Sequence, residues 1–382
     1  MSDVPHLRFP EFRGEWEKCK VSDLLDFYST NSLSWEQLEY DTNAMMNLHY
    51  GLIHVGLPTL VDLAKDKMPN IKEDNMPRNF ELCKEGDVAF ADASEDTNEV
   101  AKTIEFYNLA EKNVVCGLHT IHGRDNKCKT VVGFKGYAFS STSFHNQIRR
   151  IAQGTKIYSI STKNFSECYI GLPSKPEQAK IATLLRLIDE RIATQNKIIE
   201  KLESLIKGIA HRVAGMGKPN VCLKECLECT SSTLQESEVS DLGPYPVYGA
   251  NGIVGFLDSY NTPDEAIYIV KDGSGVGSVA YVKGKCSATG TLNILTAKQN
   301  YSLLFLYYIL KVFNFEPYKT GMAIPHIYFK DYSKAKIFCS SYSKQLRYAK
   351  MLEAIDAKLW IEQKVFISLN SQKQYLLRLM FI

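Results

Sequence analysis

Two segments of the chain carry apolar residues at alternating steps of three and four, the spacing of a helix that buries one narrow stripe. Each segment predicts a helix of about 38 residues, or about 57 Å at 1.5 Å per residue. A polar residue, Gln195 or Glu362, interrupts each stripe, and such residues fix the register of a coiled coil at some cost in stability. The first stripe is Leu185, Ile188, Ile192, Gln195, Ile199, Leu202, Ile206 and Ile209; the second is Leu352, Ile355, Leu359, Glu362, Phe366, Leu369, Lys373 and Leu376.

The two stripes belong to a duplication in the chain. At an offset of 167 residues, 180–185 aligns with 347–352, and Gly154 aligns with Gly321. A weaker repeat at an offset of 202 places 24–26 opposite 226–228. Because the whole stripe is repeated, we expect the two helices to pair with each other. The alternative is two ordinary amphipathic helices, each buried in its own domain.

Proline and glycine mark the expected domain boundaries. Pro173 and Pro176 prevent the first long helix from starting earlier, and Gly215 to Pro219 end it. The regions between the helices have strand composition at 156–160, 266–270 and 279–283, and 303–313 is a predicted short buried helix. The sequence therefore predicts an α+β class, with mixed domains at 1–172 and 216–338 and long helices at 173–215 and 339–382.

The composition is ordinary for a folded protein. With 382 residues, 45% of them hydrophobic and 23% charged, the chain fits two globular units and excludes disordered or collagen-like classes. The start of the chain lacks the regions of a signal peptide, and the longest apolar run, 303–310, is too short to cross a bilayer. We therefore expect a cytoplasmic protein that makes no membrane contact and whose ten cysteines are reduced.

The net charge of +2 conceals two basic windows. Residues 122–163 sum to +7 and residues 271–336 to +6, which leaves −11 for the rest of the chain. Aromatic residues are interleaved in both windows, which suits the binding of phosphate and nucleic acid. A solvated lysine face is the alternative for either window alone. Recurrence in both copies favours nucleic acid.

The remaining motifs do not nominate a catalytic centre. Cys222, Cys226 and Cys229 have the C-x3-C-x2-C spacing of an iron-sulfur site in radical S-adenosylmethionine enzymes. Yet Glu228 replaces the usual aromatic residue, and the repeat aligns two of these cysteines with apolar positions, so a structural role is favoured. The glycine-rich run 273–277 precedes a strand rather than the helix that a phosphate-binding loop requires. The histidines lack metal-ligand spacing, and we expect no metal site.

Several segments resemble specificity subunits of type I restriction-modification systems. The opening Pro5–Trp16 is similar to the start of those subunits, and Pro244–Ile253 and Gly321–Ile327 resemble segments of their target recognition domains. The duplicated stretches Glu177–Leu185 and Lys344–Leu352 are similar to the family's repeated spacer helices. The second copy departs from the first at 339–341, and the first domain lacks a counterpart of 245–253. The resemblance covers essentially the whole chain.

The resemblance implies a non-catalytic DNA reader. Its two target recognition domains would read a bipartite, asymmetric sequence in double-stranded DNA. Its helices would pair as an antiparallel coiled coil with pseudo-twofold symmetry, and two methyltransferase subunits would dock on the chain and bring the restriction subunits. The resemblance places no cofactor in this chain, because S-adenosylmethionine, ATP and Mg²⁺ belong to the partners.

Arginine, asparagine and glutamine suit base edges, and lysine suits phosphates. Two alternatives stay open: an iron-sulfur enzyme using the three cysteines, and a coiled-coil adaptor that binds only protein. From loop-like context and charge, the candidate DNA contacts are Arg124, Asn146, Gln147, Arg149, Arg150 and Lys156 in the first domain, and Tyr248, Asn251, Lys271, Ser274, Lys319 and His326 in the second.

Overall fold

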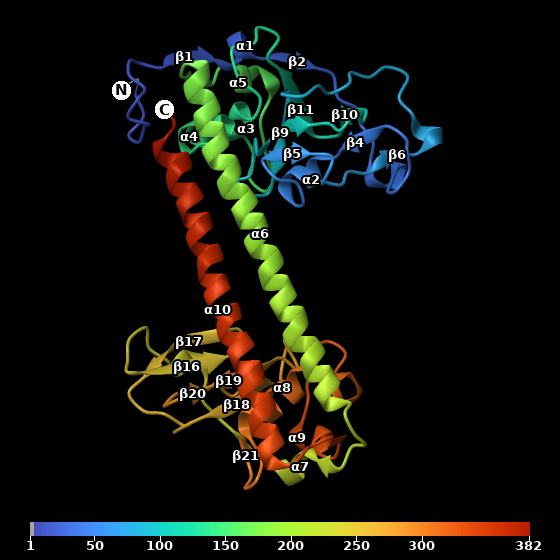
Figure 1. Cartoon of the computed structure of the whole chain (residues 1–382), viewed down its shortest axis with the longest axis vertical. Helices are drawn as coiled ribbons and strands as arrows, with labels where there is room; N and C mark the ends of the chain where they lie inside the picture. Colours follow the sequence, from blue (N-terminus) through green and yellow to red (C-terminus); the bar gives the residue numbers. More distant parts are fainter. Residues whose placement is uncertain (1–3) are drawn as a thin grey trace. The chain divides into compact units, whose positions relative to one another are not determined.

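The computed structural model describes residues 4–382 and divides them into two compact units. The first unit comprises the chain up to Thr194 together with Phe366–Ile382, and the second comprises Gln195–Val365. The long helices α6 (Lys175–Ala214) and α10 (Tyr342–Leu379) each contribute one part to each unit (Figure 1). The predicted mixed fold with two long helices is confirmed. Among residues 4–382, no helix has the length and hydropathy needed to span a membrane.

The first unit is built on two sheets joined by short helices. One is five-stranded, in the order β2 (Asp26–Tyr28), β11 (Thr120–Arg124), β7 (Val88–Ala91), β9 (Thr103–Asn108), β5 (Leu60–Asp62). The other is four-stranded, in the order β10 (Val114–Cys116), β4 (Met46–Leu48), β6 (Asn70–Ile71), β3 (Leu38–Glu39). Two-stranded pairs join β1 (Glu17–Lys20) to β13 (Tyr169–Leu172) and β8 (Ala93–Ser94) to β12 (Tyr158–Ser159). The helices are α1 (Val21–Leu24), α2 (Tyr50–His54), α3 (Phe134–Phe139), α4 (Thr142–Ile151) and α5 (Thr162–Ser166), with 3-10 turns η1 (Trp35–Gln37) and η2 (Glu73–Asn75).

The second unit also combines sheets with short helices. A four-stranded antiparallel sheet has the order β15 (Leu227–Ser231), β21 (Leu292–Ala297), β18 (Ala266–Val270), β19 (Val279–Val282). A three-stranded sheet has the order β17 (Gly252–Leu257), β16 (Tyr245–Gly249), β20 (Ser287–Ala288), and β14 (Val221–Cys222) pairs with β22 (Lys336–Ile337). The predicted strands at 266–270 and 279–283 and the predicted helix from 303 are confirmed. The helices are α7 (Leu223–Cys226), α8 (Leu303–Lys311) and α9 (Phe329–Tyr332), with 3-10 turns η3 (Glu236–Glu238) and η4 (Glu316–Tyr318).

The duplication found in the sequence extends to individual hydrogen bonds. Gln178, at the start of α6, accepts from the Val131 amide at 2.9 Å and donates to a carbonyl five residues before it. Gln345, its equivalent in α10, does the same with the Ser302 amide at 3.0 Å. Tyr137 donates to Asp189 at 2.9 Å, and Tyr308 donates to the equivalent Asp356 at 3.1 Å. The two units are therefore two copies of one plan.

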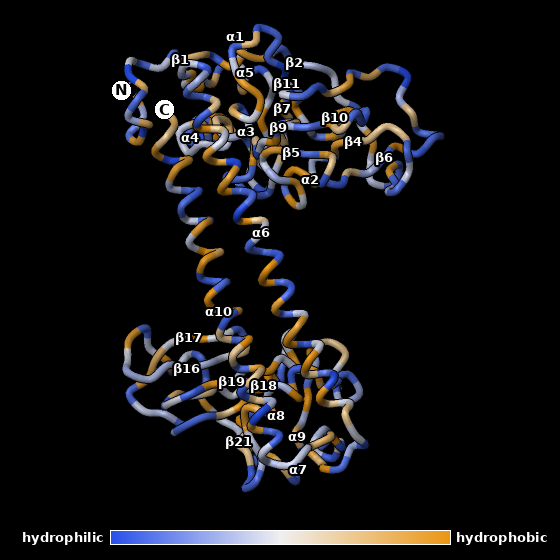
Figure 2. Tube along the Cα trace, in the orientation of Figure 1, coloured by the Kyte–Doolittle hydropathy of each residue, from blue (hydrophilic) through white to orange (hydrophobic). Residues whose placement is uncertain are grey.

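The long helices contact each other inside each unit. In the second unit, the side chain of Gln195 donates to the backbone carbonyl of Glu362 at 3.0 Å, and Tyr348 contacts Met216. From the first contact to the second, the residue number rises from 195 to 216 on the α6 side and falls from 362 to 348 in α10. The helices are therefore antiparallel there. In the first unit, Lys373 forms an ion pair with Asp189 at 2.6 Å. Apolar and polar residues alternate along both helices (Figure 2).

The residues of the predicted stripes are buried or half-buried in the structure. Leu185 and Leu352 are fully buried, and the polar interruptions Gln195 and Glu362 are buried as well. The half-buried members are Ile192, Leu202, Ile209, Ile355, Phe366 and Lys373. The predicted domain boundaries stay a prediction, because the compact units divide each long helix internally rather than at its ends.

Candidate nucleic-acid interface

Two loops of the second unit are held together by backbone hydrogen bonds. The Gly273 amide donates to the Pro325 carbonyl at 3.0 Å, and the Ile327 amide donates to the Lys271 carbonyl at 2.9 Å. His326 Nδ1 lies 2.7 Å from Asp272 Oδ1, which adds a side-chain contact between the loops. We call residues 271–277 and 319–327 the paired loops. They bring together four predicted DNA contacts, which are Lys271, Ser274, Lys319 and His326.

The second of the paired loops turns tightly at Gly321. Its φ of +89° lies in the left-handed region, and a Cβ there would collide with the carbonyl oxygen of Ile324. The backbones of Thr320 and His326 close the turn with two hydrogen bonds of 2.9 and 2.7 Å. Met322 is fully exposed at the tip of this turn. The loop therefore presents the Met322 side chain outward from a turn that backbone hydrogen bonds close.

The first unit contains the equivalent turn. Gly154 has a φ of +138°, and a Cβ there would collide with the carbonyl oxygen of Ile157. Gln153 and Ser159 close the turn with hydrogen bonds of 3.0 and 2.8 Å, at positions 167 residues before Thr320 and His326. Lys156, a predicted DNA contact, is exposed on this turn. We call residues 153–159 the first-unit turn.

Helix α4 lies next to this region and carries four predicted contacts. Ser141 caps the helix by accepting from the Phe144 amide at 3.3 Å, and Phe144 and Ile148 face the core. Arg149 reaches Asn98, in the loop that follows β8, with a hydrogen bond of 2.6 Å. Because β8 pairs with β12, this contact connects α4 to the first-unit turn. The exposed predicted contacts on α4 are Asn146, Arg149 and Arg150.

Gln147, the fourth predicted contact on α4, is half-buried, and its side-chain amide is bonded within the protein. It donates to the backbone carbonyl of Tyr169 at 2.8 Å and accepts from the Tyr169 amide at 2.9 Å. Both ends of the side chain are therefore engaged within the protein. Gln147 therefore holds α4 against β13.

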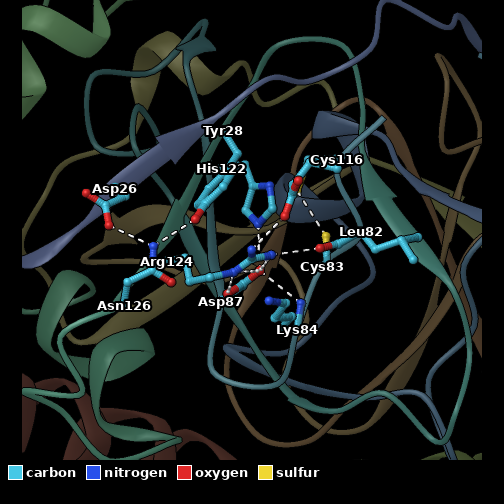
Figure 3. A network of polar contacts seen from close by, with 11 residues as sticks. Asp26, Tyr28, Leu82, Cys83, Lys84, Asp87, Cys116, His122, Arg124 and Asn126 are labelled. Carbon is cyan, nitrogen blue, oxygen red and sulfur yellow. Dashed lines mark hydrogen bonds and ion pairs between the residues drawn. The ribbon is translucent and has the colours of Figure 1, made fainter. Parts of the chain in front are cut away.

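The structure corrects the expectation for Arg124. Its side chain is buried at 6% exposure, and its guanidinium donates to Asp87 and to the Leu82 carbonyl (Figure 3). It also donates to Glu81 at 2.6 Å. The group also lies over the ring of Tyr28, 4.4 Å from its centroid. Although burial opposes it, hydrogen bonds from His122 and Arg124 lower the pKa of Asp87. Arg124 is therefore a structural residue, since all of its polar edges face the protein.

Tyr248 and Asn251 lie on the three-stranded sheet rather than on the paired loops. Tyr248 is half-buried and packs edge-on against Tyr268 with ring centroids 5.8 Å apart, and burial raises its pKa. Asn251 is exposed in the tight connection between β16 and β17. Lys319 belongs to the paired loops but pairs with Glu316 at 2.6 Å.

The three cysteines at 222, 226 and 229 do not form a metal-ligand group among the described residues. Cys226 is buried and contacts the carbonyl of Leu223 inside α7. Burial raises the pKa of Cys229 to about 11. In the described residues the three sulfur atoms are not gathered at one point, and the structural role expected for these cysteines stays a prediction.

Sequence reasoning missed the exposed apolar side chains on the two turns. Ile157 is 62% exposed in the first-unit turn and Ile324 is 58% exposed at the equivalent position. The signal was present in the sequence, because the alignment of Gly154 with Gly321 also pairs these isoleucines. The candidate DNA contacts were selected by charge and hydrogen-bonding type, and this criterion leaves isoleucine out.

Comparison with known proteins gives one consistent result. A family model described as the type I restriction modification DNA specificity domain matches residues 104–204 and again residues 218–370. A Mycoplasma genitalium protein described as a type I specificity subunit is 26% identical over 302 residues, covering 72% of this chain and 78% of that protein. The specificity subunit of the Escherichia coli EcoprrI type I restriction enzyme is 25% identical over 112 residues, 29% of this chain and 28% of that protein.

Solved structures show the same fold. The crystal structure of a type I restriction-modification S subunit from M. genitalium superposes with a TM-score of 0.64 at 19% identity, and covers 99% of both chains. A chain from a study of complex assembly in a type I restriction-modification system superposes with a TM-score of 0.56 at 16% identity, covering 95% of this chain and 96% of that one.

Proposed function

Since the family model matches well over half of its length, the chain belongs to the type I restriction-modification DNA specificity family, and we propose that it reads a bipartite, asymmetric DNA sequence. Family members are in general non-catalytic. The observation that carries the proposal is a tight exposed turn that occurs in both units. In each unit a left-handed glycine and two backbone hydrogen bonds at equivalent positions form the turn. Each turn lies in a window of positive charge, as expected for a surface that approaches phosphates.

The two half-sites should differ in sequence. The repeat aligns Lys156 with Ala323, and Ser159 with His326, so the equivalent turns offer different hydrogen-bonding groups. The paired loops add Lys271 and Ser274, whereas α4 adds Arg149 and Arg150 in the first unit. Because base edges are read by the pattern of donors and acceptors, unlike side chains on a shared scaffold specify unlike bases.

The long helices also offer surfaces for partner subunits. Trp360 is 60% exposed on α10, where a large aromatic side chain suits an interface core. We propose that two methyltransferase subunits dock on these helices and that the restriction subunits assemble through them. S-adenosylmethionine, ATP and Mg²⁺ are then bound by those partners. The exposed apolar residues on the helices include Leu187, Ile198, Leu205, Met351, Trp360, Ile361, Ile367 and Tyr375.

A charge reversal on α4 tests the proposal against an adaptor that binds only protein. The double variant R149E/R150E, co-expressed with the cognate methyltransferase subunit, should bind target DNA at least about tenfold more weakly, because it replaces two cations that attract phosphate. Its salt dependence should also be shallower. DNA binding is measured by fluorescence anisotropy on the purified complex.

The matched control is K65E/K67E, which reverses two exposed lysines in the loop between β5 and β6 of the same unit. This control should retain the affinity of the wild type. Unchanged DNA affinity in R149E/R150E, with the complex intact, would support the adaptor instead.

A further inference from the structure

A cluster of possible metal ligands lies in the core of the first unit. Cys83 Sγ, Cys116 Sγ and a ring nitrogen of His122 all lie within 4.8 Å of one another. The two sulfur atoms are 3.6 Å apart. All three residues are buried, and Figure 3 shows them together with Asp87 and Arg124. The DNA-reading function does not use any of these three side chains.

The three residues come from different parts of the fold. Cys116 ends β10 in the four-stranded sheet, and His122 lies in β11 of the five-stranded sheet. Cys83 precedes β7, and its neighbour Leu82 forms an isolated bridge with Val115. A ligand held by all three side chains would therefore connect the two sheets of the unit.

The hydrogen bonds of His122 leave one nitrogen for such a ligand. Its Nε2 lies 2.7 Å from Asp87 Oδ2, whereas its Nδ1 is buried without a hydrogen-bond partner. Buried polar atoms are normally satisfied, so an orphan imidazole nitrogen calls for an explanation. A histidine that binds a metal through one nitrogen typically presents the other to a carboxylate, which fixes the ring and its tautomer. Asp87 has that position here.

We propose that Cys83, Cys116 and His122 bind a zinc ion. Two thiolates, each about 2.3 Å from one tetrahedral zinc, have sulfur atoms about 3.8 Å apart, and the observed 3.6 Å requires little rearrangement. His122 Nδ1 supplies the third ligand, and a water molecule completes the tetrahedron. On binding, each thiol that is protonated releases its proton to solvent and its sulfur lone pair bonds to the metal.

The charges around the cluster favour a cation. Two thiolates would neutralise Zn²⁺, and the single positive charge of Arg124 is more than offset by the carboxylates of Asp87 and Glu81, with which it forms ion pairs of 2.8 and 2.6 Å. The cation of Arg124 is thus held by carboxylates and does not oppose the metal. The zinc ion acts as a structural link between the four-stranded and the five-stranded sheet of the first unit. This proposal is independent of the proposed DNA target.

The test uses the full chain purified with its methyltransferase partner from zinc-supplemented cells. Metal analysis should find one zinc per chain above the content of the partner purified alone. In the double variant C83S/C116S the zinc content per chain should fall at least about tenfold, because serine replaces both thiolates. The matched control C168S/C286S, which replaces two other buried cysteines, should keep it. Since C83S/C116S can fail to fold, cobalt substitution of the wild-type chain provides a second measurement.

Cobalt bound by two thiolates should show sulfur-to-metal charge-transfer absorption, and a chelator should lower the melting temperature until zinc, but not magnesium, is restored. A wild-type chain without zinc and without the cobalt charge-transfer band would overturn the proposal. So would mass spectrometry showing a disulfide between Cys83 and Cys116 in metal-free protein.

Discussion

At the scale of single residues, the sequence indicated which stretches are basic but not which cations are free. Arg124 and Arg149 lie in the same positive window, yet one is buried and the other exposed. The difference arises from Asp87 and Glu81, which lie 37 and 43 residues earlier and outside the window. Ion pairs over such separations depend on strand pairing, which a charge count does not contain.

The structural role of Arg124 has a measurable consequence. Replacing it with methionine removes the charge that compensates buried Asp87 and should lower the free energy of unfolding by about 3–5 kcal/mol. The exposed control R150M should change it by less than about 0.5 kcal/mol. Urea denaturation of the purified chain or its complex measures both. If R124M kept the stability of the wild type but lost DNA affinity, Arg124 would be a DNA contact rather than a structural residue.

At the scale of elements, the long helices were the most predictable part of the chain. Their stripes, their proline and glycine limits and their duplication all agree, and the structure has helices at Lys175–Ala214 and Tyr342–Leu379. Apart from 156–160, which contains β12, the short strands of the first unit were not predicted, because strands such as β3 and β6, of two residues each, carry too little periodic pattern. The cysteine pair of Cys83 and Cys116 was missed for a similar reason, since it depends on how two sheets meet.

The polar contact between the helices should make stability depend on pH. Hydrogen bonds from Lys358 and Gln195 lower the pKa of Glu362 below its ordinary value of 4.5. A lowered carboxyl pKa stabilises the folded state above 4.5, and that contribution is lost as the pH falls through the folded-state pKa. The urea midpoint of the wild type should therefore fall more steeply on acidification than that of E362Q.

The control for this measurement is E203Q, on an exposed position of α6. It shows how much of the change in slope follows from removing any helix carboxylate. Parallel pH profiles for the wild type and E362Q would mean that Glu362 does not couple helix pairing to pH.

At the scale of the whole molecule, the duplication has the greatest explanatory value. It predicted two copies of one plan, and the structure repeats the hydrogen bonds of Gln178 at Gln345 and those of the turn at Gly154 at Gly321. The bases that we propose each unit reads were not predictable, because base recognition depends on a few exposed side chains whose positions follow no periodic rule. The duplicated fold can thus be predicted from the sequence, whereas the DNA sequence that it recognises has to be measured.

The central claim is that each unit reads its own half of a split DNA sequence. The most direct test is methylome sequencing of cells that express this chain with its methyltransferase subunit, compared with a variant in which residues 216–338 are exchanged for those of another family member. We predict a bipartite motif in which the exchange alters one half and leaves the other unchanged. A continuous motif, or a motif that the exchange leaves intact, would contradict the account.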